Sequence, residues 1–249
     1  MMRVEVCVES VAGVAAAARA GAARAELCAS LFEGGTTPSH GALVRARRVA
    51  GIELVALLRP RGGDFVYAEE ELAVLAADVD AAVELGLDGV ALGCLTIEGA
   101  VDEERTARLA ERARPLAVTF HRAFDHARDP VEALDVLTRL GVRRVLTSGQ
   151  ATTAAEGRAC IAQLVRRARE RAGAPTIVAA GGIRPENALA LVRETGVGEV
   201  HCALSRRVDG AAGFRNVRAR LAALSRVPED FAHWETAEDQ VRALLDALA

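Results

Sequence analysis

The sequence predicts a single (β/α)8 barrel, the TIM-barrel fold, which occupies residues 1–249 as one domain. The chain has 249 residues, close to the ~250 that this fold typically needs. A glycine and an apolar residue recur after the predicted helices and directly before short β-rich runs, and a glycine at that place closes a helix. Strands and helices therefore alternate along the chain, which is typical of a parallel sheet with helical crossovers. An open doubly wound sheet is the weaker alternative, because no GxGxxG follows the first strand.

The predicted strands are short runs rich in aliphatic and β-branched residues. The first strand includes the alternating residues Val4, Glu5 and Val6, and such alternation is typical of a strand. Several of the others follow a glycine at once, as the run after Gly51 does. In chain order the strands are predicted at 3–8, 25–28, 54–58, 90–92, 116–120, 145–147, 176–180 and 200–202.

The predicted helices begin near residues that cap a helix or fit its first turn. Serine, threonine and aspartate side chains accept hydrogen bonds from the first free N–H groups, and proline fits the first turn. The expected starts are Ser10, Ser39, Glu69, Asp102, Asp129, Thr152 and Arg184, with Pro130 and Pro185 in first turns. The expected N-caps are Ser10, Ser39, Asp102, Asp129 and Thr152. An eighth helix near 236–248 closes the ring.

The longest connections follow strand ends and lie at 29–38, 60–68 and 203–235. Loops of this length in a compact domain usually carry function. The last one contains Phe214, Phe231 and Trp234. We expect these rings to seal the barrel, Trp234 above all, or to form a contact in a homo-oligomer.

The composition excludes several classes of protein. The net charge is -3 with no basic tail, so we expect no nucleic-acid partner, and no apolar stretch is long enough to predict a membrane span. The chain has no lysine, which excludes lysine Schiff-base chemistry, because arginine does not form such bases. The first residues resemble a strand rather than a leader, and the cysteines are scattered. We therefore expect reduced thiols and a cytoplasmic location.

Polar and thiol side chains gather at the ends of the predicted strands, the face that carries the active site in this fold. They are Glu5, Cys7, Glu26, Cys28, Arg59, Arg61, His121, Arg122, Ser148, His201 and Cys202. Alternate residues of a strand share a face, so Glu5 lies with Cys7, and Glu26 lies with Cys28. If these faces point inward, two carboxylates and two thiols line one side of the barrel mouth.

Arginines near the mouth are expected to neutralise these carboxylates, because isolated buried charges are costly. They are Arg59, Arg61 and Arg122. The two arginines of the loop at 59–65 have a second interpretation, since a guanidinium offers paired donors to an oxyanion. The alternative, in which they pair only with Glu26 and Asp64, stays open.

His121 follows the fifth strand, where barrel enzymes keep catalytic groups. It is predicted to be a general base, a metal ligand or a hydrogen-bonded structural residue. Phosphate-binding sites in this fold often use the loops after the seventh and eighth strands. Gly181 and Gly182 follow the seventh strand, but no glycine follows the eighth, so only half of this pattern is present. The residues expected to open into one pocket are Glu5, Glu26, Arg59 and His121.

At these same segments the sequence resembles the CutC family, named for copper homeostasis. The matching stretches are 5–10, 26–28, 33–39, 59–65, 119–125, 146–150 and 199–202. The resemblance implies a (β/α)8 barrel, a cytosolic location and a role in copper handling, with copper(I) bound through Cys7 and Cys28. One position departs from the family: Ala203 stands where a serine is usual, so no serine-dependent role is expected there.

The spacing of the cysteines is compatible with one shared copper ion. Neighbouring strands lie about 4.8 Å apart, so the sulfurs of Cys7 and Cys28 can approach one another, and thiolates favour copper(I). If His201 faces inward, Cys202 faces outward and does not join the site. Cys94 and Cys160 are expected to lie elsewhere.

Two functions follow from these observations. The first is a cytosolic copper-homeostasis protein that binds copper(I). The second is a barrel enzyme acting on a small anionic metabolite, with Glu26 or His121 as the acid or base. In that second function the residues binding the substrate or anion are Arg59, Arg61, Arg122, Glu5, Ser148 and His201. The sequence leaves open whether the protein is an enzyme, and the polar mouth disfavours a purely structural module.

Overall fold

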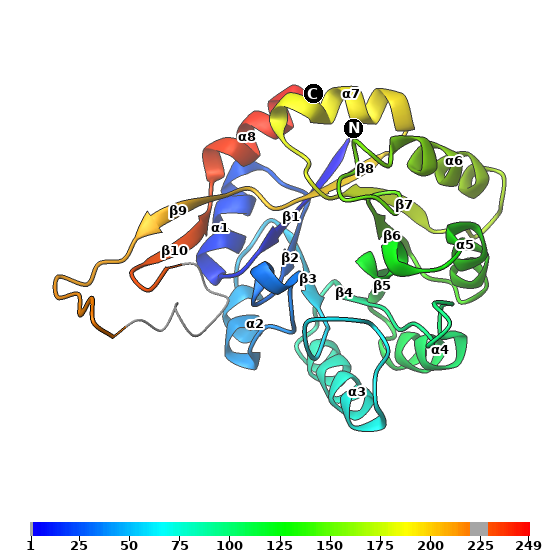
Figure 1. The fold of residues 1–249 in the computed structure, drawn as a ribbon, viewed down its shortest axis with the longest axis horizontal. Coiled ribbons are helices and arrows are strands. Elements are labelled where there is room, and N and C mark those ends of the chain that lie inside the picture. Colours follow the sequence, from blue (N-terminus) through cyan, green and yellow to red (C-terminus); the bar gives the residue numbers. More distant parts are fainter. Residues whose placement is uncertain (1, 220–228) are drawn as a thin grey trace.

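The structure, a computed structural model, describes residues 2–219 and 229–249. Parallel strands close into a barrel in sequence order, from β1 to β8, and helices surround it (Figure 1). The strands are β1 (Arg3–Val8), β2 (Arg24–Leu27), β3 (Glu53–Leu57), β4 (Gly89–Leu92), β5 (Ala117–Phe120), β6 (Arg144–Thr147), β7 (Thr176–Ala180) and β8 (Glu199–Cys202). The predicted (β/α)8 fold is confirmed, and each predicted strand end lies within one residue of the observed one.

Helices follow the strands in the predicted order. They are α1 (Val11–Ala20), α2 (His40–Ala46), α3 (Glu69–Glu84), α4 (Glu103–Arg112), α5 (Pro130–Arg139), α6 (Arg158–Arg169), α7 (Pro185–Thr195) and α8 (Glu238–Ala247). Short 3-10 turns at Leu31–Glu33 and Arg122–His126 lie in the loops after β2 and β5.

Side-chain caps fix the starts of four of these helices. Ser10 accepts a hydrogen bond from the third residue of its helix at 3.0 Å, and Ser39 and Asp102 cap α2 and α4 in the same way. Asp129 accepts from two backbone N–H groups of α5, where Pro130 is the first residue. These four predicted caps are therefore confirmed, and Pro185 likewise begins α7.

The predicted start of α6 at Thr152 is wrong, because this helix begins at Arg158. The preceding residues form a turn of their own, in which the Thr153 backbone N–H donates to the Glu156 carboxylate at 3.1 Å. Ala154 donates to the carbonyl of Gly181 at 2.9 Å. These bonds tie the segment to the loop after β7 and lengthen the connection after β6.

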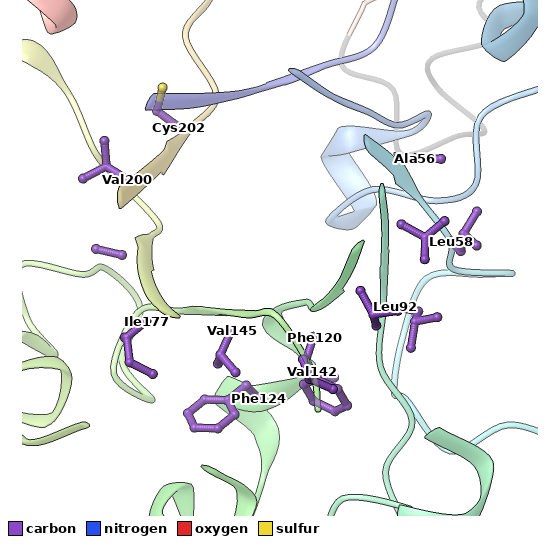
Figure 2. Close-up of a cluster of buried hydrophobic side chains, with 14 of the residues drawn as sticks. Ala56, Leu58, Leu92, Phe120, Phe124, Val142, Val145, Ile177, Val200 and Cys202 are labelled. Atoms are coloured by element: carbon purple, nitrogen blue, oxygen red, sulfur yellow. The ribbon is translucent and has the colours of Figure 1, made fainter. Parts of the chain in front are cut away.

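The apolar core lies mainly between the strands and the surrounding helices. Figure 2 shows part of this layer, with Leu58, Leu92, Val145 and Val200 among its labelled side chains. Because side chains alternate along a strand, the intervening residues face the barrel interior. The inward-facing residues near the strand ends therefore line the mouth of the barrel, where polar side chains can lie.

The connection at 203–235 contains a two-stranded antiparallel ribbon, which the sequence reading missed. Its strands are β9 (Ser205–Asp209) and β10 (Ala232–Thr236), and the ribbon extends away from the barrel (Figure 1). Trp234 is 53% exposed and Phe214 is 84% exposed. The expectation that Trp234 and Phe214 seal the barrel is wrong, because both side chains are more than half exposed.

Within the described ranges, each helix is too short or too polar to cross a lipid bilayer.

Candidate functional site

A pocket of about 270 Å³ opens at the C-terminal mouth of the barrel. The charged, histidine and thiol residues lining it are Cys7, Glu26, Arg59, His121, Arg122, Arg184, His201 and Cys202. Three of the four residues expected in one pocket, Glu26, Arg59 and His121, are thus brought together. Glu5 does not line the pocket, so that part of the expectation is wrong. Glu5 precedes Cys7 by two residues in β1 and lies one layer deeper.

Glu5 is buried beneath the pocket and is neutralised from two sides. Its carboxylate accepts a hydrogen bond from the Arg24 guanidinium and lies 2.6 Å from His201 Nδ1. Burial opposes ionisation, but the bond and charge of His201, followed by those of Arg24, lower the pKa of Glu5 to about 2. Glu5 is therefore a carboxylate at neutral pH.

Arg24 is the cation that the sequence reading missed. It is buried and also contacts Glu199 at 2.7 Å. The expectation that Arg59, Arg61 and Arg122 neutralise the buried carboxylates is wrong, since none of these three forms an ion pair with Glu5 or Glu26. Alternation could have revealed Arg24, because it lies two residues before Glu26 and so shares its face.

Glu26, His201 and Cys7 form one buried group whose ligand atoms all lie within 4.8 Å of one another. Burial, helped by the like charge of Glu5, raises the pKa of Glu26 to about 7, although the opposite charge of His201 works against this rise. Burial lowers the pKa of His201, but the carboxylates of Glu26 and Glu5 outweigh this and raise it above its ordinary value. The group can therefore hold or exchange a proton near neutral pH.

Cys7 and Cys28 meet beside this group. Their sulfur atoms lie 3.5 Å apart, because Cys7 pairs with Glu26 in the β1–β2 register and Cys28 is the next inward residue after Glu26. The hydrogen bond with Cys28, followed by burial, raises the pKa of Cys7 well above its ordinary value. Cys7 is thus a thiol in the metal-free protein.

The remaining cysteines lie away from this pair. Cys202 is a residue of the pocket lining, but it packs with the apolar layer outside the strands (Figure 2), as expected once His201 faces inward. Cys160 is in α6, and Cys94 follows β4, where burial raises its pKa to about 12.

Arg59 and Arg61 have different surroundings, although they are two residues apart. Arg59 lines the pocket and donates to the backbone carbonyls of Glu33, Gly35 and Gly63. Arg61 lies outside the pocket lining and pairs with Glu71 at 2.5 Å and with Asp64 at 3.0 Å.

Two further sequence candidates lie on the β5–β6 side. Arg122 pairs with Asp125 at 2.8 Å and donates to Ser148 Oγ at 2.8 Å. Ser148 is buried and does not line the pocket. Arg122 therefore reaches the pocket with its charge already compensated.

His121 is a neutral imidazole in the pocket wall. Burial, followed by the charge of Arg59, lowers its pKa to about 3. Its Nδ1 accepts a hydrogen bond from the Ala123 backbone at 3.2 Å, which places the single ring proton on Nε2. That N–H has no acceptor in the described part of the chain.

Comparison with known proteins gives one consistent result. A family model described as the CutC family matches residues 2–206. A CutC family protein of Chromobacterium violaceum is 46% identical over 98% of this chain and 97% of its own. The human protein named copper homeostasis protein cutC homolog is 42% identical over 88% of this chain and 79% of its own.

Solved structures agree with this comparison. A CutC protein from Streptococcus agalactiae superposes with a TM-score of 0.76 at 35% identity, covering 81% of this chain and 98% of its own. Phosphoribosylanthranilate isomerase of Thermotoga maritima matches with a TM-score of 0.55 at 15% identity, covering 99% of this chain and 98% of its own. The second match shows the fold alone.

Proposed function

This chain belongs to the CutC family, and from that premise we propose that it serves copper homeostasis in the cytoplasm by binding copper(I) through Cys7 and Cys28. The observation that carries the proposal is the 3.5 Å separation of the two sulfur atoms. Two buried thiols this close can bind one ion together, and soft sulfur ligands favour copper(I) over harder divalent ions.

The donor set around the sulfur pair fits this ion. Cys7 belongs both to the pair and to the group with His201 and Glu26, so an ion held by the thiols has an imidazole beside it. His201 Nδ1 contacts Glu5, which leaves Nε2 for the pocket side. A carboxylate on one ring nitrogen is the usual way in which a metal-binding histidine is oriented.

The thiols must lose protons before they bind the ion. Because the pKa of Cys7 is raised, copper(I) has to displace a proton from its sulfur, and affinity should fall as the pH falls. His201 and Glu26 lie next to Cys7 and can receive a proton that leaves it. Cys7 lines the pocket, so an incoming ion reaches this sulfur directly.

Free cysteines support a reducing compartment. All five cysteines are thiols in the structure, including the closely spaced pair. Such an arrangement persists in a cytosol, where disulfides are kept reduced.

The test is an anaerobic copper(I) titration against a competing chelator. We expect about one tightly bound copper ion per chain, lost in Cys7→Ser and in Cys28→Ser. Cys94→Ser and Cys202→Ser are matched controls, since both cysteines are equally buried, and they should bind as the wild type does. Thermal melting establishes that each variant is folded. Folded Cys7→Ser and Cys28→Ser variants that both bind as tightly as the wild type would refute the site.

A further inference from the structure

The pocket contains a second set of polar side chains, which are not part of the proposed copper site. Cys7 and Cys28 lie at β1 and β2, whereas His121 follows β5, opposite β1 in the closed barrel, and Arg184 follows β7, two strands from β1 through β8. Arg59 follows β3, which is next to β2 and opposite β7. All of these residues except Cys28 line the same pocket.

From this second set we infer that the pocket binds a small organic oxyanion, a phosphate monoester or a carboxylate, through Arg59, His121 and Arg184. The inference is independent of copper binding, because it uses neither thiol. It assigns to the protein a metabolite ligand in addition to the metal.

Arg59 is a buried cation that forms no ion pair with a carboxylate in the described part of the chain. It is 5% exposed, its terminal nitrogens bond only to backbone carbonyls, and its Nε has no acceptor among the residues at 2–219 and 229–249. A buried charge without an opposite charge is costly. An anion in the pocket would remove that cost.

His121 adds a second buried donor without an acceptor. Its Nε2–H is unpartnered in the described structure, and its side chain is 4% exposed. Phe65 lies beside both donors, with its ring centroid 4.8 Å from the Arg59 guanidinium carbon and 5.2 Å from the His121 ring. The two donors therefore share one wall, where a single oxyanion can accept from both.

The loop after β7 presents further donors to the same pocket. The guanidinium of Arg184 bonds only to the carbonyls of Ile183 and Ala203, so its charge is also uncompensated within the described ranges. Gly181 and Gly182 line the pocket and have φ angles of 99° and 70°, a conformation that glycine adopts without strain. The two glycines lead to Arg184 and to the start of α7 at Pro185, and the N-terminus of a helix favours an anion.

The size of the pocket limits the ligand. Its volume of about 270 Å³ lies just below the range of typical small-molecule pockets. Arginine charges from two sides and the apolar Leu57 and Leu146 in the wall fit a short molecule with one or two anionic ends.

The experiment is titration calorimetry on metal-free protein kept under a copper chelator. The probes are inorganic phosphate, glycerol phosphate and succinate, with uncharged glycerol as the control ligand. We expect saturable binding of at least one of the anions and none of glycerol. Glycerol phosphate and succinate distinguish a phosphate site from a carboxylate site.

Variants assign the site to its residues. Arg184→Met, at an exposed position, and Arg59→Met should each weaken binding about tenfold or more, the effect of losing a charge-assisted hydrogen bond. Arg193→Met, at the exposed far end of α7, should leave affinity unchanged. Cys7→Ser should still bind the anion, so a failed copper site and a failed anion site are distinguishable. The inference is overturned if every anion fails to bind wild-type protein, or if Arg184→Met binds as the wild type does.

Discussion

At the residue scale, the polar floor of the pocket depends on Glu5. This carboxylate contacts Arg24 on one side and His201 on the other, although His201 lies 196 residues away along the chain. It holds the His201 ring with Nε2 toward the pocket. Glu5 therefore fixes the orientation of the His201 ring.

Loss of the Arg24 charge should destabilise the protein strongly. Arg24→Met leaves the buried carboxylate of Glu5 without its arginine, and breaking a buried ion pair from one side costs about 3–5 kcal/mol. Arg112→Met is the control, because its pair with Asp80 is exposed and screened by solvent. Urea denaturation measures both free energies of unfolding. Equal effects of the two substitutions would mean that the buried pair has no special role.

The buried His121 should make the protein less stable in acid. Its pKa is lowered from 6.5 to about 3, so below the ordinary value the unfolded chain takes up a proton that the folded chain refuses. The contribution of the neutral His121 ring to the free energy of unfolding is thus fully present above pH 6.5 and is lost as the pH falls toward 3.

A His121→Gln variant isolates this effect, since glutamine does not titrate. The difference in unfolding free energy between wild type and variant should change by up to about 1.4 kcal/mol per pH unit between about pH 6 and pH 4. Urea denaturation at several pH values measures it. A difference that stays constant over this range would contradict a neutral His121.

The residues at the mouth were only partly predictable from the sequence. Strand ends identified Glu26, Arg59 and His121, because position in a barrel strand follows from local pattern. The ion-pair partners of the arginines could not be predicted from the sequence. A long arginine side chain can reach several neighbours, and the fold determines which of them it contacts. Arg61 turns to its own loop and helix, while Arg24 reaches the barrel interior.

At the element scale, helix starts were predictable where a side chain caps the helix. Asp129 with Pro130 marks α5 in the sequence as clearly as in the structure. The start of α6 has Gly157 without a side-chain cap, so nothing local distinguishes it from the threonines upstream. The ribbon of β9 and β10 was missed for a related reason, because its strands are polar and mostly exposed.

Substitution of Trp234 tests the corrected placement of the ribbon. Because Trp234 is half exposed and does not seal the barrel, Trp234→Ser should change the unfolding free energy by less than about 0.5 kcal/mol. Circular dichroism is the suitable measurement, since the variant lacks the chain's single tryptophan. A loss of about 3–5 kcal/mol, as for a large core side chain, would instead place the ring in the core.

At the scale of the whole molecule, closure of the barrel creates the site. Pairing of β1 with β8 brings His201 opposite Glu5, and pairing of β1 with β2 brings Cys7 opposite Glu26. The sequence predicted the closed barrel and hence the side of the molecule on which these residues meet. The sequence could not predict how far each side chain lies below the mouth. In the structure Glu5 lies below the pocket and Cys7 lies in its wall.

Self-association stays a prediction. Trp234 and Phe32 are both more than half exposed and line one surface groove with Leu31, so this is the face through which we expect a homo-oligomer to form. Sedimentation velocity at micromolar concentration should show a species larger than the monomer, which Trp234→Ser shifts to the monomer. A wild type that sediments as a monomer would contradict this prediction.

The most direct test of copper binding is to locate the ion. Crystals loaded anaerobically with copper(I) can be measured at the copper absorption edge, where an anomalous difference map shows copper atoms alone. We predict one strong peak between the sulfur atoms of Cys7 and Cys28. A peak at Cys94 or Cys160 instead, or crystals that exclude copper from the mouth of the barrel, would contradict the account.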